Sequence, residues 1–538
     1  MKINIRDRIG IESLAWAIVL AIAAIIAIVP AGWHAQYMRI DDSFYYPIIA
    51  RNIARGLGST YDGGITLTNG YHPLWAWLHV PLAWLSGKTL SLTYLHLSNI
   101  LMVVTTVLAI FIWWRVIRRV FEDQIAPAVF VLLLGSYWWS ISYFYGGLET
   151  PLVVLFMGAS MLQAQRIVNS ESLSLLDAIF LGALMGATFL ARLDSVFYLS
   201  ILSLALLIYY VRQRAYKPLL AIPGTVLILT IPYLLWNLIR FGNLIPVSGL
   251  KKTVGLNLAD GLVKMSIASE SLLGKVLEII PPIILLILII AGLAIMITMR
   301  QQIVIAFRKW GVLKVLPIGA LIHFLYTSFI MSEGHVGWYH YAEYLSLYLI
   351  LATLTHAFVL FVNDKGWRRL TYAPFAIVVL AIATQFVFLI TQSLANPHRA
   401  GIAVYDTAMW SKENLPPDSR IGMYDSGMFQ FISGLDTISL NGLAGDAELM
   451  NLAIENDIRS IISRYDLDYV VTFTTSPAWY GNYTSLGDVT FESPYIVYRD
   501  DTQIDREKRG FRILNFVVID SNFYLESEDI RFKTGTEK

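Results

Sequence analysis

The sequence predicts a polytopic α-helical membrane protein with a small α/β domain at its C-terminal end. Its 538 residues are 56% hydrophobic and only 15% charged, whereas soluble domains average about 25% charged residues. Apolar runs long enough to cross a bilayer recur along residues 1–393. From residue 394 to residue 538 the charged residues become more frequent and the apolar runs shorten. We therefore expect a membrane domain over 1–393 and an extracytoplasmic domain over 394–538.

The first apolar run, residues 13–33, follows the basic residues Lys2, Arg6 and Arg8. A cleaved signal peptide has this polarity, but its apolar stretch is usually about 7–15 residues long. The run is longer than that, so we interpret it as a retained first helix.

Ten further runs bring the prediction to about eleven spans. They cover roughly residues 91–114, 124–143, 150–166, 175–191, 194–211, 217–238, 276–298, 314–331, 341–363 and 370–392. Clusters of Lys and Arg between spans mark the cytoplasmic side of a membrane protein. In this sequence, all of these clusters and the N-terminus fall on the same side of the membrane if residues 72–86 do not cross it. That segment contains Pro73 and Pro81, is short for a span, and fits a juxtamembrane or re-entrant helix.

This topology predicts a multi-pass protein of the plasma membrane with a cytoplasmic N-terminus and an outer C-terminal domain. The predicted outer loops are 34–90, 144–149, 192–193, 239–275 and 332–340. In the C-terminal region, predicted strands alternate with predicted helices, as in a small α/β domain. The strands cover 420–424, 437–440 and 469–472, and the helices cover 402–414 and 446–464.

Composition excludes several kinds of function. Without cysteine the chain has no disulfides, thiolate zinc sites or cysteine nucleophiles. The net charge is +1 and no basic patch is evident, so we expect no nucleic-acid partner.

Two adjacent acids, Asp41 and Asp42, follow the first span and begin an amphipathic stretch, residues 43–57. One interpretation is structural: Asp42 is the N-cap of this helix and Asp41 a surface acid. The other is catalytic: a cap needs one acid, whereas a base and its orienting partner need two.

The rest of the first outer loop contains hydroxyl, amide, imidazole and aromatic groups of the kind that bind a sugar. The candidates are Tyr46, Asn69, Tyr71, His72 and Trp75. The alternative is a turn before an interfacial helix that carries ordinary interfacial aromatic residues.

Later outer loops add charged candidates. Glu149 lies in a short loop before Pro151, and it either lines a site or caps the helix that this proline opens. Arg192 and Asp194 lie at the junction of two spans and either pair locally or line a cavity.

Arg240, Lys251 and Lys252 lie in the predicted outer loop 239–275, against the positive-inside tendency. They would suit a phosphate ligand, unless they are solvated loop charges. The last cluster runs from Glu333 to Tyr341 and includes Trp338, Tyr339 and His340. Glu333, His335 and His340 could be metal ligands, but their spacing matches no trusted zinc pattern. We therefore expect sugar or phosphate binding, with ordinary interfacial aromatics as the alternative.

The order of these features resembles the GT-C superfamily of polyprenyl-phosphate-sugar-dependent membrane glycosyltransferases. It is most similar to prokaryotic arabinofuranosyltransferase-like members, and more loosely to protein mannosyltransferases and lipid A aminoarabinose transferases. The resemblance covers about residues 1–393 and is carried by Asp41-Asp42-Ser43-Phe44-Tyr45-Tyr46 with Asn52 and Gly56, by Asn69-Gly70-Tyr71 to Trp75, and by Gly147-Leu148-Glu149-Thr150. Tyr424-Asp425-Ser426-Gly427 and Leu440-Asn441-Gly442-Leu443 also resemble outer domains of such enzymes.

The resemblance implies transfer of a sugar from a polyprenyl-phosphate donor to a hydroxyl of a glycan, lipid or protein acceptor on the outer face. It assigns Asp41 as the general base, with inversion expected, and the departing phosphate needs nearby positive charge. The candidates for that charge are Arg192, Lys251, Lys252 and His340. The sequence departs from the double-histidine and Asp-x-Asp metal arrangements of some relatives, so we expect no required cofactor and leave a divalent metal open.

Two other classes of protein remain as alternatives. A transporter or flippase of a lipid-linked sugar would often contain internal repeats and mid-membrane charge. Here no repeat is evident and the polar groups gather at one predicted surface. A sensor with an outer ligand-binding domain would not explain acids in two separate outer loops.

Overall fold

A computed structural model describes most of the chain and confirms the helical membrane class. The described residues are 5–170, 174–253, 255–258, 261–262, 292–332, 336–395, 400–455, 457–473, 496–499, 504–506, 511–513 and 516–522. Among them, eight helices are long and apolar enough to cross a membrane, or nine if one bent pair counts as a span, and one further apolar helix is shorter. These elements match the predicted spans except 276–298, most of which lies outside the described residues.

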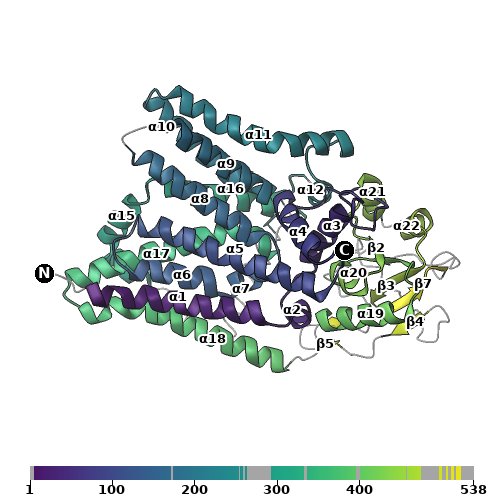
Figure 1. The fold of residues 1–538 in the computed structure, drawn as a ribbon. Coiled ribbons are helices and arrows are strands. Elements are labelled where there is room, and N and C mark those ends of the chain that lie inside the picture. The colour runs from purple at the N-terminus through teal and green to yellow at the C-terminus, as the bar shows by residue number, and fades with distance from the viewer. Residues whose placement is uncertain are drawn as a thin grey trace.

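The long helices run side by side and form an elongated body (Figure 1). They are α1 (Ile5–Ile28), α5 (Leu92–Arg118), α8 (Thr150–Val168), α9 (Leu175–Ala191), α10 (Val196–Arg212), α11 (Tyr216–Phe241), α16 (Val315–Phe329), α17 (Tyr341–Asp364) and α18 (Ala373–Ala395). The bent pair is α6 (Ile125–Ser136) and α7 (Trp138–Phe144), which meet at 51°.

Short helices gather at the end of the body that carries the C-terminal elements (Figure 1). They are α2 (Ala31–Tyr37), the 3-10 turn η1 (Asp41–Phe44), α3 (Tyr45–Arg55), α4 (Pro73–Leu85) and α12 (Val247–Lys252). Helix α3 ends at Gly56, whose φ of 83° lies in the left-handed region that favours glycine. Helix α4 has 13 residues, too few to cross a bilayer, which agrees with the interpretation of residues 72–86 as a non-crossing segment.

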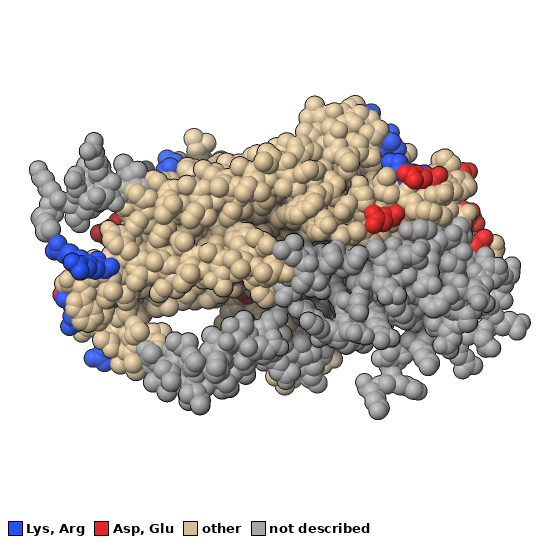
Figure 2. Space-filling view, turned by 90° about the horizontal axis from the view of Figure 1, so that it is seen from below, with Lys and Arg blue, Asp and Glu red and all other residues tan. Residues whose placement is uncertain are grey.

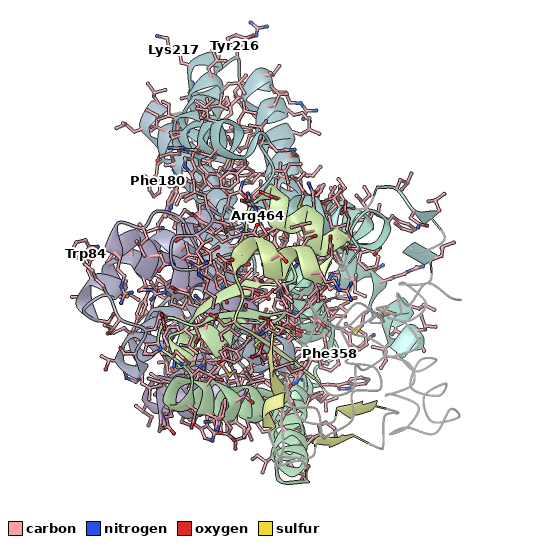
Figure 3. All side chains as sticks on the ribbon, turned by 90° about the vertical axis from the view of Figure 1, so that its right-hand side faces the viewer. Trp84, Phe180, Tyr216, Lys217, Phe358 and Arg464 are labelled. Atoms are coloured by element: carbon pink, nitrogen blue, oxygen red, sulfur yellow. The ribbon has the colours of Figure 1, made fainter. Side chains whose placement is uncertain are left out.

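Ion pairs mark the opposite end of the body. Arg118 lies 3.2 Å from Glu12, and Lys309, just after α15 (Arg300–Arg308), lies 3.2 Å from Glu122. Between the two ends the visible surface is almost uncharged (Figure 2). Trp84 and Phe180 point outward from the body (Figure 3) and are more than half exposed. An uncharged surface with exposed apolar and aromatic side chains is what contact with a lipid bilayer requires.

The C-terminal region forms a mixed five-stranded sheet in the order β2-β1-β3-β7-β4, plus the hairpin β5-β6. Strands β1, β2 and β3 are parallel, and β7 is antiparallel to both β3 and β4. The strands are β1 (Arg420–Met423), β2 (Asp436–Ser439), β3 (Tyr469–Phe473), β4 (Ile496–Arg499), β5 (Ile504–Arg506), β6 (Phe511–Ile513) and β7 (Phe516–Asp520). The helices are α19 (Ala400–Asn414), α20 (Gly427–Ser433), α21 (Ala447–Ile454) and α22 (Ile458–Tyr465).

The three predicted strands are confirmed, but the single predicted helix over 446–464 is wrong. Asp446 caps α21 by accepting from the backbone N–H of Leu449, and Asp457 caps α22 by accepting from that of Ser460. A second N-cap inside the stretch starts a new helix. The division of the chain at residue 393 stays a prediction.

The C-terminal region packs directly on the first predicted outer loop. The Tyr61 hydroxyl lies 2.9 Å from Ser426 Oγ, and Gln430 Nε2 donates to the Tyr61 carbonyl at 2.9 Å. The rings of Phe44 and Phe431 are 5.5 Å apart. These contacts place the C-terminal elements against the loop that carries the acidic pair.

Candidate active site

A cavity of about 430 Å³ lies where the short helices meet the ends of the long ones. Its lining comes from the first predicted outer loop, the loop before α8, the α9–α10 junction, residues 244–252, and single positions on or near α11, α16 and α17, which include Leu234, Tyr326, Met331, Trp338 and Tyr339. One lining residue, Leu443, comes from the C-terminal region. The volume falls in the range of small-molecule sites.

The lining of the cavity has an apolar and a polar part. The apolar part includes Phe189, Val196, Phe197, Leu234, Ile245 and Met331, from or next to the membrane helices. The polar part includes Asp42, Tyr46, His72, Glu149, Arg192, Lys252 and Tyr339. A cavity of this kind fits a ligand with a polar head and an apolar tail.

Glu149 is the centre of the polar part. Its Oε1 lies 2.7 Å from Arg192 Nη1 and 3.5 Å from His72 Nε2, and its Oε2 accepts from the Tyr46 hydroxyl at 2.5 Å. Glu149 occupies the N-cap position of α8, but its side chain makes no capping bond to that helix and lines the cavity instead. Burial lowers the pKa of His72 although the Glu149 carboxylate raises it, which favours the neutral imidazole.

Arg192 and Asp194 pair with each other and also line the cavity. The local ion pair and the role in the cavity lining are therefore not alternatives. Arg192 Nε donates to both Asp194 oxygens, at 3.0 and 3.1 Å. Asp194 also accepts from the Tyr341 hydroxyl at 3.0 Å and lies 3.4 Å from His323 Nε2. His323 Nδ1 lies 2.8 Å from Glu343 Oε1. The chain of charged groups therefore extends from the cavity into α16 and α17.

Sequence reasoning missed His323, Tyr341 and Glu343 as part of this network. A signal was present, because ionisable residues such as His323 and Glu343 in otherwise apolar spans are functional candidates. Without the fold, nothing in the sequence paired them with Asp194.

The two adjacent lysines point to different neighbours. Lys252 lines the cavity, and its Nζ donates to the Tyr339 hydroxyl at 2.9 Å. Lys251 Nζ donates to the backbone carbonyl of Asn441 in the C-terminal region, and Lys251 is not part of the cavity lining.

The two adjacent acids, Asp41 and Asp42, also have different surroundings. Asp42 lines the cavity, whereas Asp41 is not part of its lining. The Asp41 carboxylate accepts from the backbone N–H groups of Gly427 and Met428, both at 2.9 Å. The N-cap position of α3 is Phe44, without a side-chain capping bond, so the interpretation of Asp42 as that cap is wrong.

Asp41 is in an unfavourable environment for a charge. Burial and the nearby Asp425 raise the pKa of Asp41 to about 8, although its two bonds from backbone amides favour the ionised form.

Among the other predicted residues, Tyr71 and Trp338 line the cavity, whereas Asn69, Trp75 and His340 do not. Asn69 accepts from the N–H of Val247 at 3.0 Å and so fixes the chain beside the cavity. Trp75 Nε1 donates to the carbonyl of Gly147 at 3.1 Å, and His340 lies 3.9 Å from Glu343. Glu333 and His335 lie outside the described residues.

Within the described part of the chain, no group of three or more His, Cys, Asp or Glu side chains is arranged to hold a metal ion.

Comparison with solved structures shows the fold class. ArnT from Cupriavidus metallidurans in the apo state has a TM-score of 0.55 and 14% identity, over 94% of this chain and 98% of that one. The same protein bound to undecaprenyl phosphate has a TM-score of 0.54 and 14% identity, over 94% and 97%. The Archaeoglobus fulgidus oligosaccharyltransferase complexed with Zn and sulfate has a TM-score of 0.51 and 15% identity, over 86% and 68%. The chain is thus a multi-pass membrane protein with the fold of GT-C membrane enzymes.

Comparison of the sequence with family models and with curated proteins does not indicate a function. Residues 393–511 match the family described as a domain of unknown function (DUF8728). No curated protein matches the sequence significantly.

Proposed function

We propose that this chain is an integral membrane glycosyltransferase. It moves a sugar from a polyprenyl-phosphate donor to an acceptor hydroxyl on the extracytoplasmic face. The observation that carries the proposal is the two-part cavity, in which charged groups face an apolar wall built by membrane helices. The likeness in fold to ArnT, which was solved with undecaprenyl phosphate bound, supports the same kind of donor.

The polar part of the cavity suits the donor phosphate. Lys252 supplies an ammonium group at the lining, and Arg192 supplies a guanidinium held in place by Glu149 and Asp194. Cations that face a leaving phosphate stabilise the charge that develops there. The prenyl chain would extend along the apolar part, towards Phe189, Phe197 and Leu234.

Asp42 is the better placed of the two acids to act as general base. It lines the cavity, whereas both oxygens of Asp41 are occupied by backbone N–H groups outside the lining. The resemblance assigned this role to Asp41, and the assignment stays a prediction that the paired variants described in the Discussion test. A sugar or protein hydroxyl is a weak nucleophile until its proton is removed.

The proposed step is a single displacement. The acceptor oxygen forms a bond to the anomeric carbon while the bond from that carbon to the phosphate oxygen breaks. The hydroxyl proton passes to the Asp42 carboxylate, and the bonding electron pair leaves with the polyprenyl phosphate. One direct displacement inverts the anomeric centre.

Four polar or aromatic groups in the lining suit the sugar. Tyr46 and His72 are tied to Glu149, which orients them, and Tyr71 and Trp338 add aromatic faces. Hydrogen bonds and ring stacking of this type recognise both pentoses and hexoses.

The test is transfer by the purified protein in lipid nanodiscs, with a panel of radiolabelled polyprenyl-phosphate sugars and a set of glycan, lipid and peptide acceptors. We expect label in an acceptor from at least one lipid-linked donor and none from nucleotide sugars. Transfer from a nucleotide sugar in the nanodiscs would contradict the proposal, as would movement of the lipid-linked sugar across the bilayer of sealed proteoliposomes without transfer.

A further inference from the structure

Asp41 joins two parts of the chain that are 386 residues apart in sequence. Both of its carboxylate oxygens accept backbone N–H bonds at 2.9 Å, one from Gly427 and one from Met428. These are the first two residues of α20, the helix that connects strands β1 and β2. A residue of the membrane domain therefore supplies the acceptors for the first backbone donors of α20, which have no partner inside their own helix.

The contact is close enough to exclude any side chain at Gly427. A Cβ built on Gly427 would lie 2.3 Å from the Asp41 carbonyl oxygen and 3.0 Å from its Oδ2. Since real Cβ atoms do not approach backbone so closely, even a methyl group at this position would push α20 away from η1.

The segment that follows the supersecondary unit β1-α20-β2 forms part of the cavity wall. After β2 the chain continues to Leu443, which lines the cavity, and the Leu443 carbonyl packs tightly against Gly70 of the first outer loop. Lys251 Nζ donates to the carbonyl of Asn441 just before it.

We propose that Asp41 is a positioning residue that docks the β1-α20-β2 unit on the membrane domain and so fixes the Leu443 wall of the cavity. It acts through the backbone of Gly427 and Met428 and does not touch the reacting atoms. The inference deepens the proposed function, on which its effect on transfer rests, whereas the docking contact can be measured without any transfer assay.

The docking is tested by hydrogen–deuterium exchange of the full-length protein in nanodiscs. The readout is the exchange of residues 427–433 in the wild type, Asp41→Ala and Asp42→Ala. We expect exchange of the first amides of α20 to rise at least tenfold in Asp41→Ala and to stay within twofold of the wild type in Asp42→Ala. Unchanged exchange in Asp41→Ala would overturn the inference.

A second variant separates docking from loss of the acid. Gly427→Ala keeps both carboxylates but adds the methyl group that the contact excludes, so it should raise exchange in the same segment. In both variants the amides of α8 should exchange as in the wild type, which shows that the membrane domain is folded. If Asp41→Ala fails this control, Gly427→Ala decides the question.

Transfer activity then tests the positioning role. We expect Gly427→Ala to lower transfer at least tenfold, as Asp41→Ala does, because both displace the Leu443 wall. Wild-type transfer by Gly427→Ala with raised exchange would overturn the positioning role. If the wild type transfers no sugar from any donor, the proposed function fails, and the exchange measurements still decide the docking.

Discussion

Glu149 Oε1 lies 2.7 Å from Arg192 Nη1, and both residues are almost completely buried, at 2% and 1% exposure. Arg192 also holds Asp194 through its Nε. Removal of the arginine would therefore take a cation from both Glu149 and Asp194, whereas removal of Glu149 leaves the arginine paired with Asp194.

We accordingly predict that Arg192→Gln destabilises the protein more than Glu149→Gln. Arg192→Gln removes the cation of a buried ion pair, which costs about 3–5 kcal/mol. Glu149→Gln leaves Arg192 its bond to Asp194, so it should cost only about 1–3 kcal/mol, the cost of losing one buried hydrogen-bonding partner. The measurement is thermal unfolding of the two variants in the same detergent. Equal melting temperatures, or a lower one for Glu149→Gln, would contradict the network described here.

Asp42→Asn should lower kcat for transfer by roughly 10²–10⁴-fold, the usual contribution of a general base, and leave the melting temperature unchanged. Glu122→Gln is the matched control, because Glu122 is an exposed acid paired with Lys309 at the opposite end of the body. That variant should keep wild-type transfer. Full activity of Asp42→Asn beside an inactive, folded Asp41→Asn would return the base role to Asp41.

Lys252→Met should raise KM for the lipid-linked donor at least tenfold, since its ammonium lines the cavity. Lys309→Met is the control, because Lys309 pairs with Glu122 at the opposite end of the body. It should leave the donor KM unchanged. The same rise in KM for both variants would show that the effect does not arise from the ammonium group in the cavity.

Stability should depend on pH through Asp41. Burial and Asp425 raise its pKa to about 8 in the folded chain, against about 3.9 in an unfolded one. Between these values the folded chain holds a proton that the unfolded chain has lost, so stability falls as pH rises from about 4 to about 8 and then levels off. Asp42 also faces this carboxyl, while Tyr45 and Tyr61 stay neutral because burial raises their pKa.

Asp41→Asn cannot ionise and should lack this contribution. Its melting temperature relative to the wild type should therefore increase steadily between pH 5 and pH 8, whatever the difference at pH 5. A difference that does not change over this range would mean that Asp41 keeps an ordinary pKa.

Much of the architecture could be predicted because it follows from local sequence. Apolar runs of sufficient length gave the spans, and the basic clusters between them grouped the predicted outer loops on one side. The structure brings Asp42, Glu149, Arg192 and Lys252 from those loops into one cavity.

The separation of neighbouring residues could not be predicted in the same way. Lys251 and Lys252 are adjacent in α12, and successive side chains of a helix point about 100° apart. Which one faces the cavity depends on how α12 packs. The contact between Asp41 and Gly427 depends on the tertiary fold alone, so no local pattern signals it.

The most direct test of the central claim is incubation of the purified protein with radiolabelled polyprenyl-phosphate sugars and acceptors, with Asp42→Asn run in parallel. The account predicts label in the acceptor, free polyprenyl phosphate as the second product, and loss of both in the variant. Label transferred equally by the wild type and Asp42→Asn, or only from nucleotide sugars, would contradict it.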